Sequence, residues 1–309
     1  MDIRERYKKQ GGIKLDELAG QFDVIEYGYT DEYSNLESVA IHIPRKKEVL
    51  VNDASSVMFK EVPNYVELLN EVDQYRNLLR SLGVKVYDDA MFKDADLHGP
   101  YPNLIYMRDL GVLSHDRLIL ANPKYDIRKG EQEIMLTTMR RSGFVGSILD
   151  LPESVTMEGA DFFWINDKEV LISVGNRTSK EFAQIFSNLY PDINVRTVEA
   201  APEGIPQHIL GGAHIIDKDT IIQRKAIIKH DLGFKNVIEL EETDEVIKGF
   251  AMNVVTINKM EIIMPSGNPN TKALYESRGI KVHETPCFEI RKMGGALACM
   301  SLPIKRKSK

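Results

Sequence analysis

The feature that most constrains the fold is a short unit that recurs along the chain: a helical segment, a turn residue and a run rich in β-forming residues. The five examples are LLRSLGVKVYD (78–88), MRRSGFVGSILDL (139–151), IFSNLYPDINVRTVE (185–199), KHDLGFKNVIELE (229–241) and LYESRGIKVHE (274–284). Their turn residues are Gly83, Gly143, Pro191, Gly233 and Gly279. Glycine suits such positions because a helix often ends in a left-handed residue, a conformation that glycine adopts at no steric cost. The spacing of roughly 40–60 residues is typical of repeat architectures.

Between the predicted helices lie paired strand-like runs. ADFFWINDKEVLISVG (160–175) turns after Asn166, and MNVVTINKMEIIMPSG (252–267) turns after Asn258. The complete unit is therefore strand, strand, helix, turn, strand, repeated five times. We predict an α/β fold of five such ββαβ units, and the alternative is an ordinary α/β chain in which helix-glycine-strand junctions recur. No linker rich in proline or serine divides the chain, which favours one domain.

Composition and charge argue against several classes of protein. The net charge of −6 and the pI of about 5.7 disfavour a nucleic-acid binder, which usually carries a basic stripe. Two cysteines cannot form a disulfide framework, so we expect a cytoplasmic protein. The first residues are polar rather than an apolar signal region, and no stretch approaches the roughly 20 apolar residues of a membrane helix. We therefore expect neither a nucleic acid nor a membrane as a partner, and a homo-oligomer remains open.

Charged or reactive side chains interrupt otherwise apolar runs at four places. The runs are YMRDLGVL, SVTMEGADFFW, IPQHILGGAHIID and GGALACMSLP. The residues in question are Arg108, Asp109, Glu158, Asp161, His208 and Cys299. A charge is costly to bury unless it is paired, so each of these charged groups needs a partner or a ligand.

Each of these residues also has a purely structural interpretation. Arg108 and its neighbouring aspartate could form an ion pair, His208 could be a hydrogen-bonded core histidine, and Cys299 a small buried hydrophobe. The other cysteine, Cys287, is expected to be structural. A zinc site at His283 and Cys287 is not expected, because no second ligand pair with zinc spacing accompanies them. Taken together, however, the residues supply a thiol nucleophile, an imidazole base, a carboxylate to orient it and further carboxylates for a cationic substrate.

In this order, YMRD, MEGAD, the His208 segment and GGALACMSLPIKR resemble motifs of the guanidino-group-modifying enzymes of the pentein superfamily. That group includes arginine deiminases, arginine dihydrolases, dimethylarginine dimethylaminohydrolases and amidinotransferases. DEYSNLESVAIHIP (31–44) and residues 252–284 resemble further segments of these enzymes. The resemblance implies a five-bladed ββαβ propeller with pseudo-fivefold symmetry. It runs from about residue 31, so we expect a single catalytic domain, 31–309, after an N-terminal extension, 1–30.

The resemblance also implies the catalytic roles. Cys299 would be the nucleophile and His208 the general acid and base, with Glu158 hydrogen-bonded to the histidine. A thiolate suits attack on a guanidinium because it is a strong nucleophile without being strongly basic. No metal and no organic cofactor is implied.

Five residues would bind the substrate, a small cationic guanidino compound. The resemblance gives Asp109 the guanidinium, which a carboxylate can hold through paired, charge-assisted hydrogen bonds. It places Arg108 beside it, supporting the site or the substrate carboxylate. The remaining three residues would be Asp161, Asn253 and Asn35.

The sequence departs from the family pattern at three positions. Many relatives have His-x-Asp, where this chain has His208-Ile-Leu210, so a second guanidinium anchor is missing. Ala298 stands where relatives often carry a histidine, and Ala160 replaces the second glycine of Glu-Gly-Gly-Asp. These changes leave the identity of the guanidino substrate open.

The expected function is hydrolysis of the guanidino group of arginine or a related compound, with release of ammonia or an amine. It would proceed through a covalent amidino-thioether on Cys299. The alternative is an amidinotransferase, in which an amine takes the amidino group from the same intermediate. A non-catalytic binding role, known in the same superfamily, would not need the Cys-His-Glu set. A papain-like protease is disfavoured because its cysteine lies near the start of the mature chain.

Overall fold

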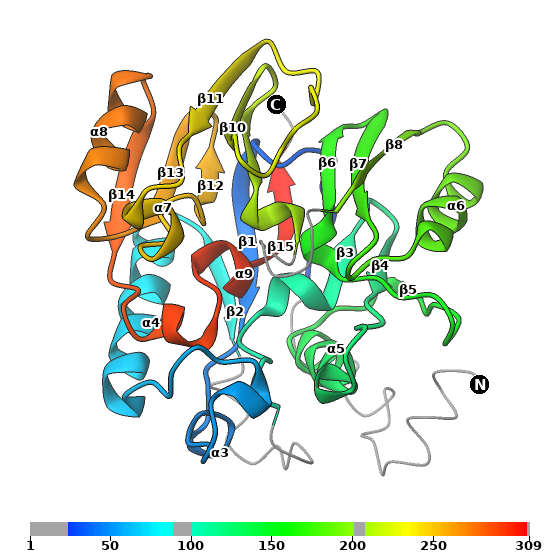
Figure 1. Cartoon of the computed structure of the whole chain (residues 1–309). Helices are drawn as coiled ribbons and strands as arrows, with labels where there is room; N and C mark the ends of the chain where they lie inside the picture. Colours follow the sequence, from blue (N-terminus) through cyan, green and yellow to red (C-terminus); the bar gives the residue numbers. More distant parts are fainter. Residues whose placement is uncertain (1–23, 89–100, 201–207, 308–309) are drawn as a thin grey trace.

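The computed structural model describes residues 24–88, 101–200 and 208–307. Within them the strands form five sheets of three strands each, which confirms the predicted α/β fold (Figure 1). In every sheet the middle strand pairs antiparallel with one neighbour and parallel with the other. The sheets, in spatial order, are β15 (Leu302–Lys307), β1 (Asn35–Ile41) and β2 (Lys85–Asp88); β3 (Gly111–Leu113), β4 (Arg117–Leu120) and β5 (Ser147–Leu149); β6 (Phe162–Asn166), β7 (Glu169–Val174) and β8 (Asn194–Glu199); β9 (Ala213–Asp217), β10 (Thr220–Arg224) and β11 (Asn236–Leu240); and β12 (Val255–Asn258), β13 (Glu261–Pro265) and β14 (Lys281–Thr285).

In four sheets a helix connects the middle strand to the parallel strand. These helices are α4 (Tyr65–Ser81), α5 (Glu131–Arg141), α6 (Lys180–Leu189) and α8 (Pro269–Ser277), and they lie around the outside of the sheets (Figure 1). The expected glycines follow α4, α5 and α8, where Gly83, Gly143 and Gly279 have φ of 83°, 101° and 79°. The remaining α-helices are short: α3 (Lys46–Val49), α7 (Asp244–Ile247) and α9 (Leu297–Met300).

The fourth sheet differs from the prediction, because no helix precedes Gly233. Residues 225–235 connect β10 to β11 through turns, whereas the longer segment 266–280 connects β13 to β14 and contains α8. The physical reason is length, since a parallel crossover that includes a helix usually needs a dozen residues or more. Gly233 still has the expected left-handed backbone, with φ of 76°.

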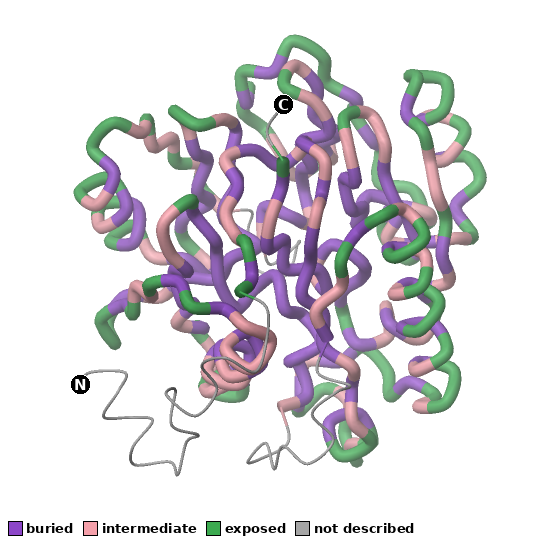
Figure 2. The backbone as a smooth tube through the Cα atoms, turned by 180° about the vertical axis from the view of Figure 1, so that it is seen from behind, coloured by how far each residue is buried: buried purple, intermediate pink, exposed green. Residues whose placement is uncertain are grey.

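The first and last strands of the chain lie side by side at the middle of the molecule (Figure 1). β1 pairs antiparallel with β15, from Asn35 opposite Lys307 to Ala40 opposite Leu302. The strands form the buried interior, and the exposed segments lie mainly on the outer helices and loops (Figure 2). The closure brings α9, immediately before β15, into the centre. No helix among the described residues is both long and apolar enough to cross a membrane.

Candidate active site

A cavity of about 530 Å³ gathers segments from different parts of the chain. Three of the expected site residues, Asp109, His208 and Cys299, line it together with Asn253. Its remaining walls come from Met58, Lys60, Asn103, Tyr106, Arg128, Leu210, Gly211, Arg224, Glu242, Val246, Ile247, Phe250, Met252, Met293, Gly294 and Gly295. The thiol, the imidazole and a carboxylate therefore share one space, although they are far apart in sequence.

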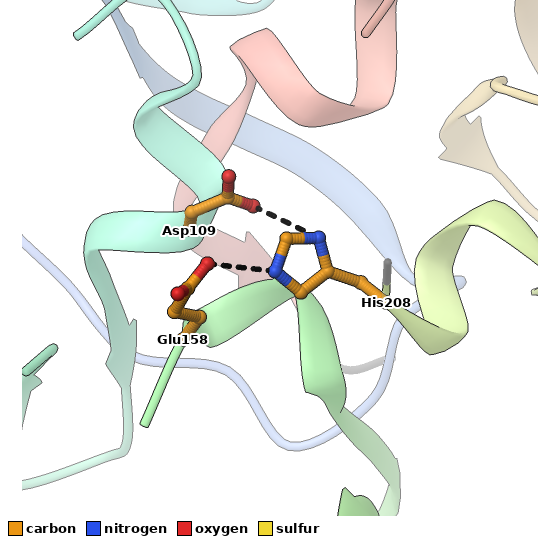
Figure 3. A group of neighbouring side chains, drawn as sticks. All are labelled: Asp109, Glu158 and His208. Carbon is orange, nitrogen blue, oxygen red and sulfur yellow. Dashed lines mark hydrogen bonds and ion pairs between the residues drawn. The ribbon is translucent and has the colours of Figure 1, made fainter. Parts of the chain in front are cut away.

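His208 lies between two carboxylates that face its two ring nitrogens (Figure 3). Its Nε2 is 2.8 Å from Oε2 of Glu158, and its Nδ1 is 3.9 Å from Oδ1 of Asp109. Burial by itself would lower the pKa of this imidazole, but Asp109, Asp161 and Glu158 raise it to about 9. The ring is therefore an imidazolium at neutral pH and can act as an acid.

Glu158 is completely buried and lies directly before the short 3₁₀ turn η5 (Gly159–Asp161). Both of its oxygens are 3.0 Å from Nη1 of Arg177, and Oε2 is 3.4 Å from Nη1 of Arg128. Burial opposes ionisation, but the hydrogen bond and charge of His208, with the two arginines, keep the pKa of Glu158 below its usual value. Glu158 is thus a fixed negative charge beneath the imidazole.

Arg128 and Arg177 are the important residues that the sequence analysis missed. Both are buried and both pair with Glu158. In sequence they stand in the polar stretches DIRKGEQE and GNRTSKE, where an arginine looks like an ordinary surface residue. No local signal distinguishes them, because their importance depends on which buried carboxylate they reach.

Asp109 comes from the 3₁₀ turn η3 (Met107–Leu110) and is buried at the wall of the cavity. Its Oδ2 accepts a 2.6 Å hydrogen bond from Nη1 of Arg128. Its Oδ1 has no hydrogen-bond partner among the described residues. One carboxylate oxygen is therefore free to accept a hydrogen bond from a ligand.

Cys299 lies on α9 and is partly exposed. Its Sγ accepts a hydrogen bond from Nδ2 of Asn253 at 3.2 Å, while Oδ1 of the same asparagine accepts one from the backbone N–H of Ala298 at 2.8 Å. Burial and then the charge of Asp109 raise the pKa of the thiol to about 11. Without a bound cation, the sulfur is therefore a neutral thiol at physiological pH.

Asp161 and Asn253 take positions different from those expected of substrate-binding residues. Asp161 is outside the cavity lining and accepts hydrogen bonds from Thr178 Oγ1 at 2.9 Å and the Ile209 N–H at 3.1 Å. Burial raises its pKa to about 6. It holds the segment that carries His208, just as Asn253 holds the segment that carries Cys299.

Two further expected residues lie away from the cavity. Arg108 is buried and donates to Glu32 Oε1 and to the Phe162 carbonyl, each at 3.0 Å. Asn35 is the first residue of β1, opposite Lys307. Neither lines the cavity, so the expectation that they contact the substrate is corrected. Consecutive residues on a tight turn point in different directions, which separates Arg108 from Asp109.

The same residues raise the question of a metal. Ligand atoms of Asp109, Glu158 and His208 lie within 4.8 Å of one another. Arg128, however, pairs with both carboxylates, and Arg177 pairs with Glu158. A divalent cation at this point would meet two buried guanidinium groups, so the donor set suits an organic cation on the open side of Asp109 better than a metal.

Comparisons with known proteins agree with this geometry. The sequence model of the family described as "Arginine deiminase" matches residues 89–235 and 212–306. The N(G),N(G)-dimethylarginine dimethylaminohydrolase of Pseudomonas aeruginosa is 24% identical over 240 residues, which cover 78% of this chain and 89% of that protein.

Solved structures share the fold. The N-terminal domain of ArgZ, an arginine dihydrolase from cyanobacteria, was solved bound to its substrate; it has a TM-score of 0.72 at 17% identity, covering 87% of this chain and 98% of that one. An amidinotransferase of the saxitoxin pathway from Microseira wollei has a TM-score of 0.72 at 13% identity, covering 92% and 98%.

Proposed function

The chain belongs to the arginine deiminase family, and from that premise we propose that it hydrolyses the guanidino group of arginine or a related compound. The observation that carries the proposal is the single cavity that contains the thiol of Cys299, the imidazolium of His208 and the free oxygen of Asp109. Relatives in the same family are guanidino-modifying hydrolases.

Binding begins with the guanidinium against Asp109. Its N–H groups donate to the free Oδ1, a charge-assisted hydrogen bond that also orients the planar group. The bound cation offsets the negative charge that raises the pKa of Cys299, so the thiol releases its proton more readily. The substrate thereby helps to generate its own nucleophile.

In the first chemical stage, the thiolate of Cys299 attacks the guanidinium carbon and a sulfur–carbon bond forms. His208 donates its proton to the departing nitrogen, the carbon–nitrogen bond breaks, and ammonia or an amine leaves. The amidino group remains on sulfur as a cationic thioether. General acid catalysis of this kind contributes roughly 10²–10⁴-fold.

In the second stage, water attacks the same carbon and the neutral imidazole accepts a proton from it. The carbon–sulfur bond breaks, a ureido product leaves and Cys299 is regenerated. Glu158 keeps the imidazole oriented through both stages and favours its protonated form. Asp161 and Asn253 hold the backbone on either side of the reacting groups.

Leu210 lines the cavity in the place where many relatives would have a second acidic anchor. Asp109 is then the main anionic contact for the guanidinium, since Glu158 is already occupied by His208 and two arginines. An amidinotransferase remains the second candidate because an enzyme of that activity shares the fold. The two reactions differ only in whether water or an amine reaches the thioether.

We further infer that the five sheets are the blades of a pseudo-fivefold propeller, with residues 31–309 as one catalytic domain. The pairing of β1 with β15 supports closure of the ring. Within the preceding segment, the N–H of Gly28 donates to the Ile304 carbonyl at 2.8 Å, so this end of the expected extension packs on the domain. We propose a cytoplasmic location and a small guanidino substrate.

The test is a product assay. The protein is incubated with arginine, methylated arginines and agmatine, each with and without glycine or ornithine, and the products are identified by mass spectrometry. We expect a ureido product and ammonia or an amine without any added acceptor. A new guanidino compound that forms only with an added amine would instead establish transfer.

The variant Cys299→Ser should lose at least about 10³-fold in kcat, because a hydroxyl is far less ionised than a thiol. Cys287→Ala is the matched control, since Cys287 is buried in the core and outside the cavity lining. Unchanged turnover by Cys299→Ser would rule out the covalent mechanism.

A further inference from the structure

Tyr106 connects the segment that carries Asp109 to the segment that carries Cys299. It immediately precedes η3, and its carbonyl accepts a hydrogen bond from the N–H of Asp109 at 3.2 Å. Its hydroxyl accepts a 2.8 Å hydrogen bond from the N–H of Gly295, four residues before Cys299. One side chain therefore links the guanidinium anchor to the backbone that leads into the nucleophile.

The contact between Tyr106 and Gly295 is tight enough to require glycine. A Cβ atom at Gly295 would lie 2.5 Å from Cε1 and 2.8 Å from Cζ of the tyrosine ring. Real Cβ atoms do not approach other atoms so closely, and the ring is buried and cannot simply move away. The backbone of the Cys299 segment thus rests directly on the face of this ring.

The same segment is fixed a second time at Ala298, whose N–H donates to Asn253. Tyr106 and Asn253 therefore hold the turn before Cys299 from two sides. Burial and the nearby charges of Cys299 and Asp109 raise the pKa of Tyr106 well above its ordinary value, so the hydroxyl stays protonated and neutral at working pH. A neutral hydroxyl does not compete with the substrate for Asp109.

We infer that Tyr106 is a positioning residue that sets the separation of Cys299 from Asp109 through its contact with Gly295. The inference rests on the proposed function, because the separation matters only if the thiol attacks a group held by Asp109. Errors of about 1 Å in such a separation can cost roughly 100-fold in rate. Substrate affinity should depend on it much less than the chemical step does.

The experiment uses Tyr106→Phe, which removes only the hydroxyl, and Gly295→Ala, which crowds the same contact from the other side. For each we measure kcat, KM and the rate at which iodoacetamide alkylates Cys299, in a Cys287→Ala background so that one thiol is read. We expect both variants to lower kcat by roughly 10–100-fold with KM within about threefold, and to change the alkylation rate. Because they break one contact, the double variant should be no worse than the poorer single variant.

Tyr275→Phe is the matched control: this tyrosine is also buried and its hydroxyl donates to the Ala251 carbonyl at 3.3 Å, but it lies outside the cavity lining. It should leave kcat and alkylation unchanged. The inference is overturned if Tyr106→Phe leaves kcat unchanged, if it changes KM alone, or if the two single effects multiply. Alkylation needs no substrate, so a failure of the proposed function would appear as absent turnover with the alkylation effects intact.

Discussion

The charge state of His208 is decided by individual side chains around it. Burial alone would leave this imidazole neutral, yet Asp109, Asp161 and Glu158 raise its pKa to about 9. Because the folded pKa exceeds the unfolded value of 6.5, this charge stabilises the fold below about pH 6.5, and the contribution is lost as the pH rises through about 9. The same titration removes the acid required for the first chemical stage.

We therefore predict that kcat falls as the pH rises through about 9, and that Glu158→Gln moves this fall to lower pH. The reason is that the variant removes the carboxylate 2.8 Å from Nε2. The measurement is kcat against pH for both proteins. Glu261→Gln is the control, because Glu261 contacts His283 at the same 2.8 Å but away from the cavity. An unshifted profile in Glu158→Gln would contradict the role given to this pair.

At the level of elements, the site depends on the close contact of two 3₁₀ turns. η3 carries Asp109, and η5 follows Glu158 and ends at Asp161. Gly159, the first residue of η5, faces backbone: a Cβ there would lie 2.3 Å from the Gly111 carbonyl oxygen and 2.4 Å from that of Arg108. The motif MEGAD thus contains glycine because two backbones meet at this point.

Gly159→Ala should lower the free energy of unfolding by at least about 1–3 kcal/mol through overpacking, and should lower kcat because Glu158 is displaced. The measurements are urea unfolding and kcat. Gly83→Ala is a useful comparison: nothing lies within 4 Å of its Cβ position, but its φ of 83° is left-handed. We expect it to cost about 1–2 kcal/mol in stability and nothing in kcat. Equal loss of activity in both variants would show that general destabilisation is responsible.

For the whole molecule, closure of the chain between β1 and β15 places Cys299 in the central cavity. Ile304 of β15 is fully buried in a core cluster that also includes Trp164 of β6, from another sheet. A shared core between sheets implies that they unfold together, as expected of one domain.

Ile304→Ala should lower the free energy of unfolding by about 2–5 kcal/mol. Trp164 is the only tryptophan, so its fluorescence reports on β6 alone, while far-UV circular dichroism reports on the whole chain. Both signals should move to the same lower urea midpoint. Val237→Ala, at an exposed position, should leave the midpoint unchanged. Separate midpoints for the two signals would mean that the sheets are independent units.

The sequence by itself determined the local elements and the chemical inventory. Glycines such as Gly83 and Gly279 mark helix ends because their backbone requirement is local. A thiol, an imidazole and carboxylates inside apolar runs signal a site because burial makes such groups costly. The sequence was misleading where a segment was short, as in the missing helix before Gly233.

Only the tertiary structure decided which of these groups meet. It paired Arg128 and Arg177 with Glu158, turned Arg108 towards Glu32, and set the ring of Tyr106 against Gly295. Such contacts join different segments of the chain, and they depend on how the sheets pack rather than on any local pattern. The identity of the reactive groups is therefore local information, whereas their charge states and separations follow from packing around the central cavity.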